Sequence, residues 1–223
     1  MEIRSLFDPS YCVEELKSLL AIDSTTGMAE PIGSYVLQRC AELGFPAYDT
    51  HKGGIIADLG GEGDTLVITA HLDDIGLMVR HINGDGTLNV CSIGGLYPFY
   101  CMGENVRVYS YGGRVTTGTV CRMPNSIHVS EEELRQQLPD FRKNVCVVLD
   151  EDVHSEAETR ALGIASGDYI ALEPRFTQSN GYLKAHFLDD KACAATLLTV
   201  MKVMREQGLA PRRHVLAYFA QYE

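Results

Sequence analysis

Residues 66–76 read Leu-Val-Ile-Thr-Ala-His-Leu-Asp-Asp-Ile-Gly. The first half of this segment is a largely apolar run bounded by polar residues, which is expected of a parallel strand buried on both faces. His71, Asp73 and Asp74 follow directly, at the carboxyl end of the predicted strand. Open α/β sheets place their sites at that end of their strands. The segment therefore predicts an α/β domain with a site built around His71.

The chemistry of this site follows from the cost of burying ionisable groups. A histidine and two carboxylates at a buried position are unfavourable unless a cation lies nearby. A divalent metal meets that need, with His71 as a neutral imidazole ligand and Asp73 holding the other ring nitrogen. The alternative is a surface loop in which both side chains are simply solvated.

A second pair of carboxylates occurs at residues 188–191, Leu-Asp-Asp-Lys, where a helix is expected to begin. Carboxylates at the start of a helix are most often N-caps. Two aspartates are more than one cap requires, however, and a carboxylate bridging two metals would come naturally from Asp189. Glu223 follows another predicted strand, at residues 214–220, and carries no signal on its own.

The order of the expected elements divides the chain into two domains. Periodicity predicts helices at residues 8–20, at about 30–43 and from 189 to 208, and strands at 55–59, 66–70, 184–188 and 214–220. Between residues 77 and 165, short β-rich runs separated by glycines predict a small barrel or sandwich. It includes a tight turn at Gly112-Gly113 and helices at about 130–138 and 155–162. We therefore expect an α/β domain of residues 1–76 plus 166–223, with a β-rich domain inserted at 77–165.

Composition narrows the possible classes of function. The chain has 223 residues and a formal net charge of −11, with 19 Lys and Arg against 30 Asp and Glu. Nucleic-acid binding needs clustered basic residues, so we expect no nucleic-acid partner. No apolar run reaches the ~20 residues that span a bilayer, and the first residues lack the pattern of a signal peptide, so we expect no membrane association. Seven scattered cysteines, none in a C-x-x-C pair, favour reduced thiols in a cytoplasmic protein.

Taken together, these motifs resemble those of the metal-dependent glutamyl and tetrahedral (TET) aminopeptidases, some of which carry an endoglucanase label. Residues 70–76 are similar to the family's A-H-M-D-E-I-G signature, with Leu and Asp in place of Met and Glu. Residues 188–191 are similar to its x-D-D/N-R motif, with Lys in place of Arg. Residues 150–168 resemble the segment that returns from the family's inserted domain to its catalytic domain. The resemblance covers essentially the whole chain.

The resemblance implies a three-layer α/β/α domain of the phosphopeptidase/aminopeptidase-like class, with an inserted barrel-like domain that makes the protein a homo-oligomer. It also implies an enzyme that releases N-terminal residues from peptides with two divalent metal ions, zinc or cobalt. By position, His71 is a metal ligand and Asp73 orients it. Asp189 bridges the metals, and Glu223 is the general base for the metal-activated water.

The same resemblance implies metal ligands that these 223 residues do not contain, namely a glutamate after Glu223 and a later Asp and His. We therefore expect a C-terminally truncated chain with an incomplete metal site, inactive or nearly so. One alternative is a non-catalytic, metal-free assembly or binding protein. Another is a related metal-dependent deacylase or carboxypeptidase, whose inserted domain is typically a helix-and-sheet unit. The short β-rich runs and glycine-rich turns of residues 77–165 disfavour that second alternative.

Overall fold

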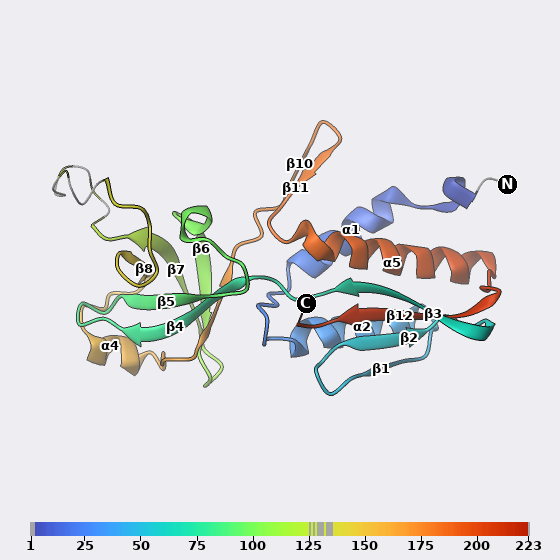
Figure 1. The fold of residues 1–223 in the computed structure, drawn as a ribbon, viewed down its shortest axis with the longest axis horizontal. Coiled ribbons are helices and arrows are strands. Elements are labelled where there is room, and N and C mark those ends of the chain that lie inside the picture. Colours follow the sequence, from blue (N-terminus) through green and yellow to red (C-terminus); the bar gives the residue numbers. More distant parts are fainter. Residues whose placement is uncertain (1–2, 125, 127, 129–131, 133–135, 223) are drawn as a thin grey trace. The chain divides into compact units, whose positions relative to one another are not determined.

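The computed structural model describes residues 3–124, 126, 128, 132 and 136–222, which form two compact units (Figure 1). The first unit joins residues 1–74 to residues 174–223, and the second comprises residues 75–173. The division expected from the sequence assigned residues 166–173 to the α/β domain. The structure instead places β9 (Tyr169–Leu172) between two strands of the barrel. The helix expected at about 130–138 falls mostly outside the described residues.

A four-stranded sheet forms the centre of the first unit. Its order is β1-β2-β12-β3, with bounds Ala47–Asp49, Ile55–Asp58, Arg213–Ala220 and Glu62–His71. Strand β12 is antiparallel to β2 and parallel to β3. Ala220 pairs with His71, so the carboxyl ends of the two parallel strands lie side by side. This is the position in which an open α/β sheet carries its site.

Helices cover one face of this sheet. They are α1 (Pro9–Leu20), α2 (Glu30–Glu42) and α5 (Leu188–Gln207), preceded by the short η1 (Ile3–Leu6). Their buried side chains share one core cluster with the inward residues of β12, such as Phe219. Helix α1 packs along α5 and makes an ion pair with α2 through Glu15 and Arg39, at 2.6 Å. The described residues thus provide two of the three layers expected from the sequence.

Strand β3 departs from the sequence-based expectation in its burial. It is parallel to β12, as expected, but it is the edge strand of the sheet. Leu66, Val67 and Ile68 are 43%, 52% and 43% exposed, so the expectation that this run is buried on both faces is wrong for the described chain. An apolar run predicts a strand, but it does not indicate which neighbouring elements bury its side chains.

The second unit is a closed six-stranded barrel with the order β4-β5-β8-β7-β6-β9. Its strands are β4 (Gly76–Ile82), β5 (Leu88–Ile93), β6 (Asn105–Tyr109), β7 (Val115–Arg122), β8 (Val145–Leu149) and β9, with η2 (Pro98–Cys101) between β5 and β6. The predicted tight turn at Gly112-Gly113 joins β6 to β7 and is closed by a hydrogen bond from the Gly113 N–H to the Ser110 carbonyl. The predicted second helix is α4 (Glu156–Ala161). The expected fold class, an α/β domain carrying a β-barrel, is confirmed.

Along the chain, a short hairpin follows the barrel strand β9 and precedes helix α5 (Figure 1). It consists of β10 (Thr177–Ser179) and β11 (Tyr182–Lys184). The strand expected at residues 184–188 is therefore shifted towards the N-terminus, because Leu188 already belongs to α5.

Candidate metal centre

The candidate site is built from two segments that are far apart in sequence and belong to the same unit. Strand β3 ends at His71, and residues 72–74 continue from it. Helix α5 begins at Leu188 and contributes the aspartate pair. The Asp190 Oδ2 atom accepts a hydrogen bond from the His71 backbone N–H, at 3.2 Å. The carboxyl end of β3 is thereby joined directly to the start of α5.

The imidazole of His71 is held in one orientation by its own loop. Its Nδ1 atom lies 3.0 Å from the backbone carbonyl oxygen of Asp73 and 3.7 Å from Oδ1 of the same residue. A carbonyl oxygen can only accept, so the neutral ring carries its proton on Nδ1 and its lone pair on Nε2. The structure thus brings Asp73 beside His71, as expected, although the closer contact is made by its main chain rather than by its carboxylate.

Asp189 faces the Nε2 atom of the imidazole. Its Oδ1 atom is 3.4 Å from His71 Nε2, and its side chain is 93% exposed. Both Asp189 and Asp190 have non-helical backbone angles, and the structure gives neither carboxylate a capping hydrogen bond from a backbone N–H of α5 among the described residues. The geometry of this segment therefore does not show Asp189 and Asp190 acting as N-caps of α5.

The facing pair of His71 and Asp189 fits a divalent metal. With metal–nitrogen and metal–oxygen bonds of about 2.0–2.2 Å and tetrahedral angles, two ligands of one zinc ion lie ~3.4 Å apart. The observed separation of 3.4 Å matches that value and is longer than a good hydrogen bond. An imidazole lone pair and a carboxylate oxygen repel each other unless a cation lies between them. The donor atoms, a neutral imidazole nitrogen and a carboxylate oxygen, are those that zinc and cobalt accept.

The number of donors falls short of a complete site. Among the described residues, no group of three or more His, Cys, Asp or Glu side chains is arranged to hold a metal ion. A catalytic zinc usually takes three protein ligands and one open position. Glu223, the expected general base, lies outside the described residues.

Asp73 and Asp74 are buried behind the imidazole. Asp73 is 4% exposed, and its Oδ2 atom accepts a hydrogen bond from the Thr26 hydroxyl at 2.7 Å. Asp74 accepts from the Ser24 hydroxyl at 2.9 Å. These bonds attach the loop after β3 to the segment that follows α1, and so fix the carbonyl that orients the ring.

Lys191 is the residue that sequence reasoning underrated. It is only 1% exposed, and its Nζ atom lies 2.5 Å from Asp74 Oδ2 and 3.0 Å from the carbonyl oxygen of Ile22. Burial raises the pKa of Asp74 from 3.8 to about 6, and the Lys191 ammonium opposes that rise. Burial likewise lowers the pKa of Lys191, against the effect of Asp74. This buried ion pair holds the start of α5 against the loop after His71. In the sequence, the only indication of the ion pair is that Lys191 directly follows two aspartates.

Comparison with known proteins agrees with this architecture. The family model described as M42 glutamyl aminopeptidase matches residues 53–223. The chain belongs to this family. The resemblance drawn from the sequence motifs is thereby confirmed. Among curated relatives, the putative aminopeptidase YhfE of Bacillus subtilis (strain 168) is 32% identical over 200 residues, which cover 88% of this chain and 57% of the relative.

Solved structures of TET aminopeptidases share the fold. A TET aminopeptidase from the marine sediment archaeon Thaumarchaeota archaeon SCGC AB-539-E09 superposes with a TM-score of 0.85 at 20% identity, covering 96% of this chain and 59% of that one. The TET1 peptidase of Pyrococcus horikoshii gives a TM-score of 0.79 at 22% identity, with 94% and 61% covered. The chain therefore spans about three-fifths of the length of these proteins. Across the residues that the structure describes, no helix combines the length and apolarity needed to cross a bilayer.

Proposed function

We propose that this chain is part of a metal-dependent aminopeptidase that releases N-terminal residues from peptides. The observation that carries the proposal is the 3.4 Å separation of His71 Nε2 and Asp189 Oδ1, with the imidazole proton held on Nδ1 by the Asp73 carbonyl. Membership of the M42 family supports the same reaction.

The residues of this chain would divide the work as follows. His71 and Asp189 would hold the divalent cations, zinc or cobalt. Asp73 and Thr26 keep the imidazole in the ligating orientation. When bound, such cations lower the pKa of a coordinated water and polarise a carbonyl. Glu223, which follows β12, would take a proton from the attacking water and return it to the leaving amine.

We further propose that the 223 residues alone hydrolyse peptides slowly or not at all. The described part of the chain offers two suitably placed donors, where a catalytic zinc usually takes three. Tight uptake of two zinc equivalents by this chain in isothermal titration calorimetry would overturn this part of the proposal.

Peptides are the proposed substrates, and the proposed compartment is the cytoplasm. We also propose self-association through the barrel unit. The Pyrococcus horikoshii TET1 peptidase, which shares the fold, can assemble into a tetrahedron or a large octahedral shell. Sedimentation velocity of this chain and of the isolated barrel unit would test where self-association resides.

The assay for the activity uses a chain extended to the length of its relatives, alongside the 223-residue chain. Aminoacyl p-nitroanilides with glutamyl, lysyl, leucyl and alanyl groups are compared with the same compounds acetylated on the amine. The proposal expects hydrolysis of the free-amine compounds only, abolished by a chelator and restored by zinc or cobalt. Hydrolysis of N-acyl amino acids instead would establish a deacylase, and release of C-terminal residues from blocked dipeptides a carboxypeptidase. No hydrolysis of any substrate by the metal-loaded extended chain would favour an assembly or binding protein.

A further inference from the structure

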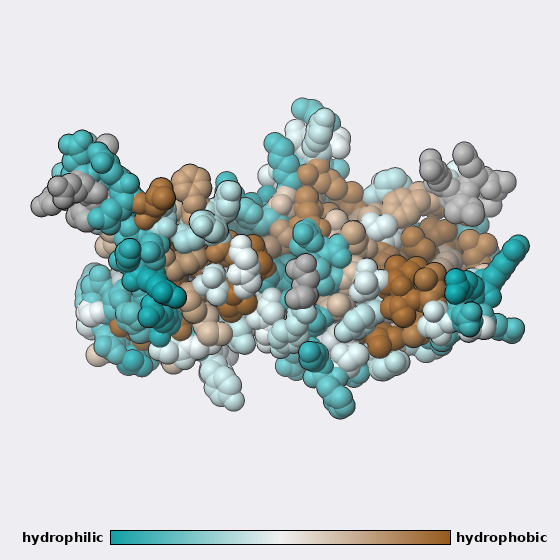
Figure 2. Space-filling view, in the orientation of Figure 1, coloured by the Kyte–Doolittle hydropathy of each residue, from teal (hydrophilic) through white to brown (hydrophobic). Residues whose placement is uncertain are grey.

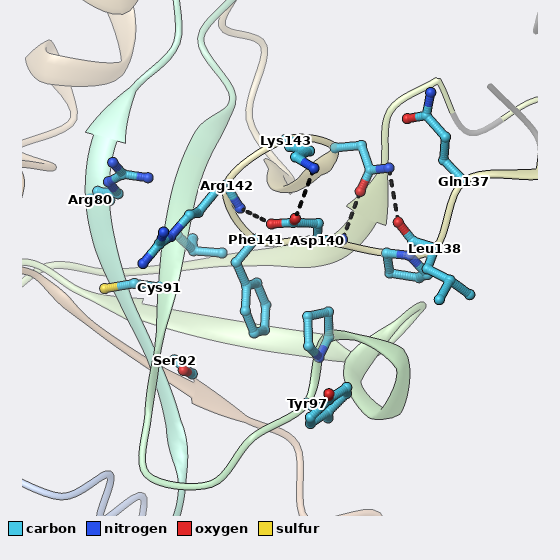
Figure 3. A pocket seen from close by; sticks show the side chains of 14 residues that line it. Arg80, Cys91, Ser92, Tyr97, Gln137, Leu138, Asp140, Phe141, Arg142 and Lys143 are labelled. Atoms are coloured by element: carbon cyan, nitrogen blue, oxygen red, sulfur yellow. Dashed lines mark hydrogen bonds and ion pairs between the residues drawn. The ribbon is translucent and has the colours of Figure 1, made fainter. Parts of the chain in front are cut away.

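The barrel unit contains a pocket of about 910 Å³ (Figure 3). One wall comes from β4 and β5, and the opposite wall from residues 137–144, with Tyr97 and Pro98 beside them. The volume lies within the range of small-molecule sites, about 300–1,000 Å³. None of the residues of the candidate metal centre lines this pocket.

The pocket is cationic in a strongly acidic protein. Arg80, Arg142 and Lys143 line it, and Asp140 is the one acidic residue among the described residues that line it. The Asp140 carboxylate is already engaged, since it accepts the backbone N–H of Arg142 at 2.8 Å and lies 3.7 Å from Lys143 Nζ. Neither the Arg80 nor the Arg142 guanidinium has an ion-pair or hydrogen-bond partner within the described part of the chain. The pocket thus carries two guanidinium groups that no described side chain neutralises, in a chain with a formal net charge of −11.

The backbone of the barrel places Arg80 in this position. Strand β4 pairs Val79 with Val90 and then His81 with Asn89, so Arg80 is the extra residue at a β-bulge. A bulge redirects side chains that regular alternation would send to the other face. Val79 is buried, whereas Arg80 and His81 are both exposed in succession.

The opposite wall is fixed by its own hydrogen bonds. Asn144 accepts the Asp140 backbone N–H at 2.8 Å and donates to the Leu138 carbonyl at 3.2 Å. The Phe141 carbonyl accepts from the buried Asn89 side chain of β5 at 3.2 Å. Figure 3 shows the phenyl ring of Phe141 below the two arginines, between the two walls. Arg142 is thus presented by a constrained turn, next to an apolar surface.

We propose that this pocket binds an organic anion. Its carboxylate or phosphate oxygens would be held by Arg80 and Arg142, and its apolar body would lie against Phe141, Val90 and Pro98. Guanidinium groups present fixed pairs of N–H donors that match carboxylate and phosphate oxygens, which is why arginine predominates in such sites. The proposal concerns the barrel unit alone and does not depend on the aminopeptidase activity.

The test is calorimetric titration of the 223-residue chain with phenyl phosphate, phenylacetate and the neutral benzyl alcohol, in low-salt buffer. The variants are Arg80→Gln, Arg142→Gln and their combination. Arg212→Gln, which removes an exposed arginine from the other unit, is the matched control. Thermal unfolding of each variant establishes that the barrel is folded.

We expect at least one of the two anions to bind, and the neutral compound not to bind. Each pocket substitution should weaken binding about tenfold, as expected for the loss of one charge-assisted hydrogen-bonding group, and the combination should abolish it. Binding of phenyl phosphate alone would assign the site to phosphate esters, and binding of phenylacetate alone would assign it to carboxylates. Absence of binding by both anions, equal binding of benzyl alcohol, or an equal loss in Arg212→Gln would overturn the proposal.

Discussion

Replacing Lys191 by methionine tests how the start of α5 is held against the loop after β3. Methionine keeps an unbranched side chain of similar length but removes the ammonium that lies 2.5 Å from Asp74 Oδ2. The carboxylate is then left buried, with one hydroxyl partner from Ser24. Removing one member of a buried ion pair typically costs about 3–5 kcal/mol. We expect a loss of that size in the free energy of unfolding, measured by urea denaturation with an unchanged m value.

The pH dependence gives this prediction a sign. Burial raises the pKa of Asp74 to about 6, above its ordinary value of 3.8, so the stability that this carboxyl contributes is present at low pH and is lost as the pH rises through its folded-state pKa. Loss of the neighbouring cation should raise that pKa further. The penalty of Lys191→Met should therefore be smaller near pH 5 than near pH 8, because protonation neutralises the stranded carboxylate.

Two controls make the result decisive. Lys202→Met removes a lysine from the same helix, where it forms a more exposed pair with Glu206, and should cost less than about 1 kcal/mol. The double variant Asp74→Asn, Lys191→Met should recover most of the loss, since removing both members of a buried pair is often nearly neutral. A Lys191→Met penalty below about 1 kcal/mol near pH 8, or one that grows on acidification, would refute the reasoning.

Two further predictions concern the sheet of the first unit. Gly61→Ala should lower the free energy of unfolding, measured by urea denaturation, by more than about 3 kcal/mol, because φ is +92° and a Cβ would lie 1.8 Å from the Arg213 carbonyl oxygen. Gly63→Ala should lower it by only about 1 kcal/mol, because φ is +80° but a Cβ there would meet open space. Equal losses would show that backbone conformation alone sets the effect. Val67→Lys, on the exposed edge strand, should reduce concentration-dependent light scattering of the 223-residue chain while changing stability by less than about 0.5 kcal/mol. Unchanged scattering would mean that this edge does not mediate association.

Figure 2 shows brown, hydrophobic surface on the first unit. Leu66, Val67 and Ile68 are the residues of β3 that the sequence identified as a buried strand and that the structure leaves 43–52% exposed. Local pattern predicted the strand and its direction, because both depend on nearby residues. Burial depends on neighbours that no local pattern contains, and this expectation therefore failed.

Some features of the candidate site could also be predicted from the sequence, and others could not. The general rule that sites gather at the carboxyl ends of strands predicted a site at His71. The family resemblance implied that Asp189 belongs to the same site, and the structure places the two side chains 3.4 Å apart. Which atom of Asp73 orients the ring depends on the path of a three-residue loop, and the structure favours the carbonyl over the carboxylate. The contact between Lys191 and Asp74 spans 117 positions in the sequence and gives no periodic signal. Such long-range polar contacts can be identified only once the three-dimensional structure is known.

The central claim is that His71 and Asp189 share a divalent cation, and nitrogen-15 NMR of the histidine side chains during a zinc titration tests it most directly. We predict that zinc shifts the Nε2 resonance of His71, leaves Nδ1 protonated, and binds at least about tenfold more weakly in Asp189→Asn, since loss of even an outer-shell partner costs about 10–100-fold. His51→Ala, which removes a histidine remote from this motif in the sequence, should leave the titration unchanged. An unshifted His71 Nε2 at saturating zinc, or equal zinc affinity in Asp189→Asn, would contradict the claim.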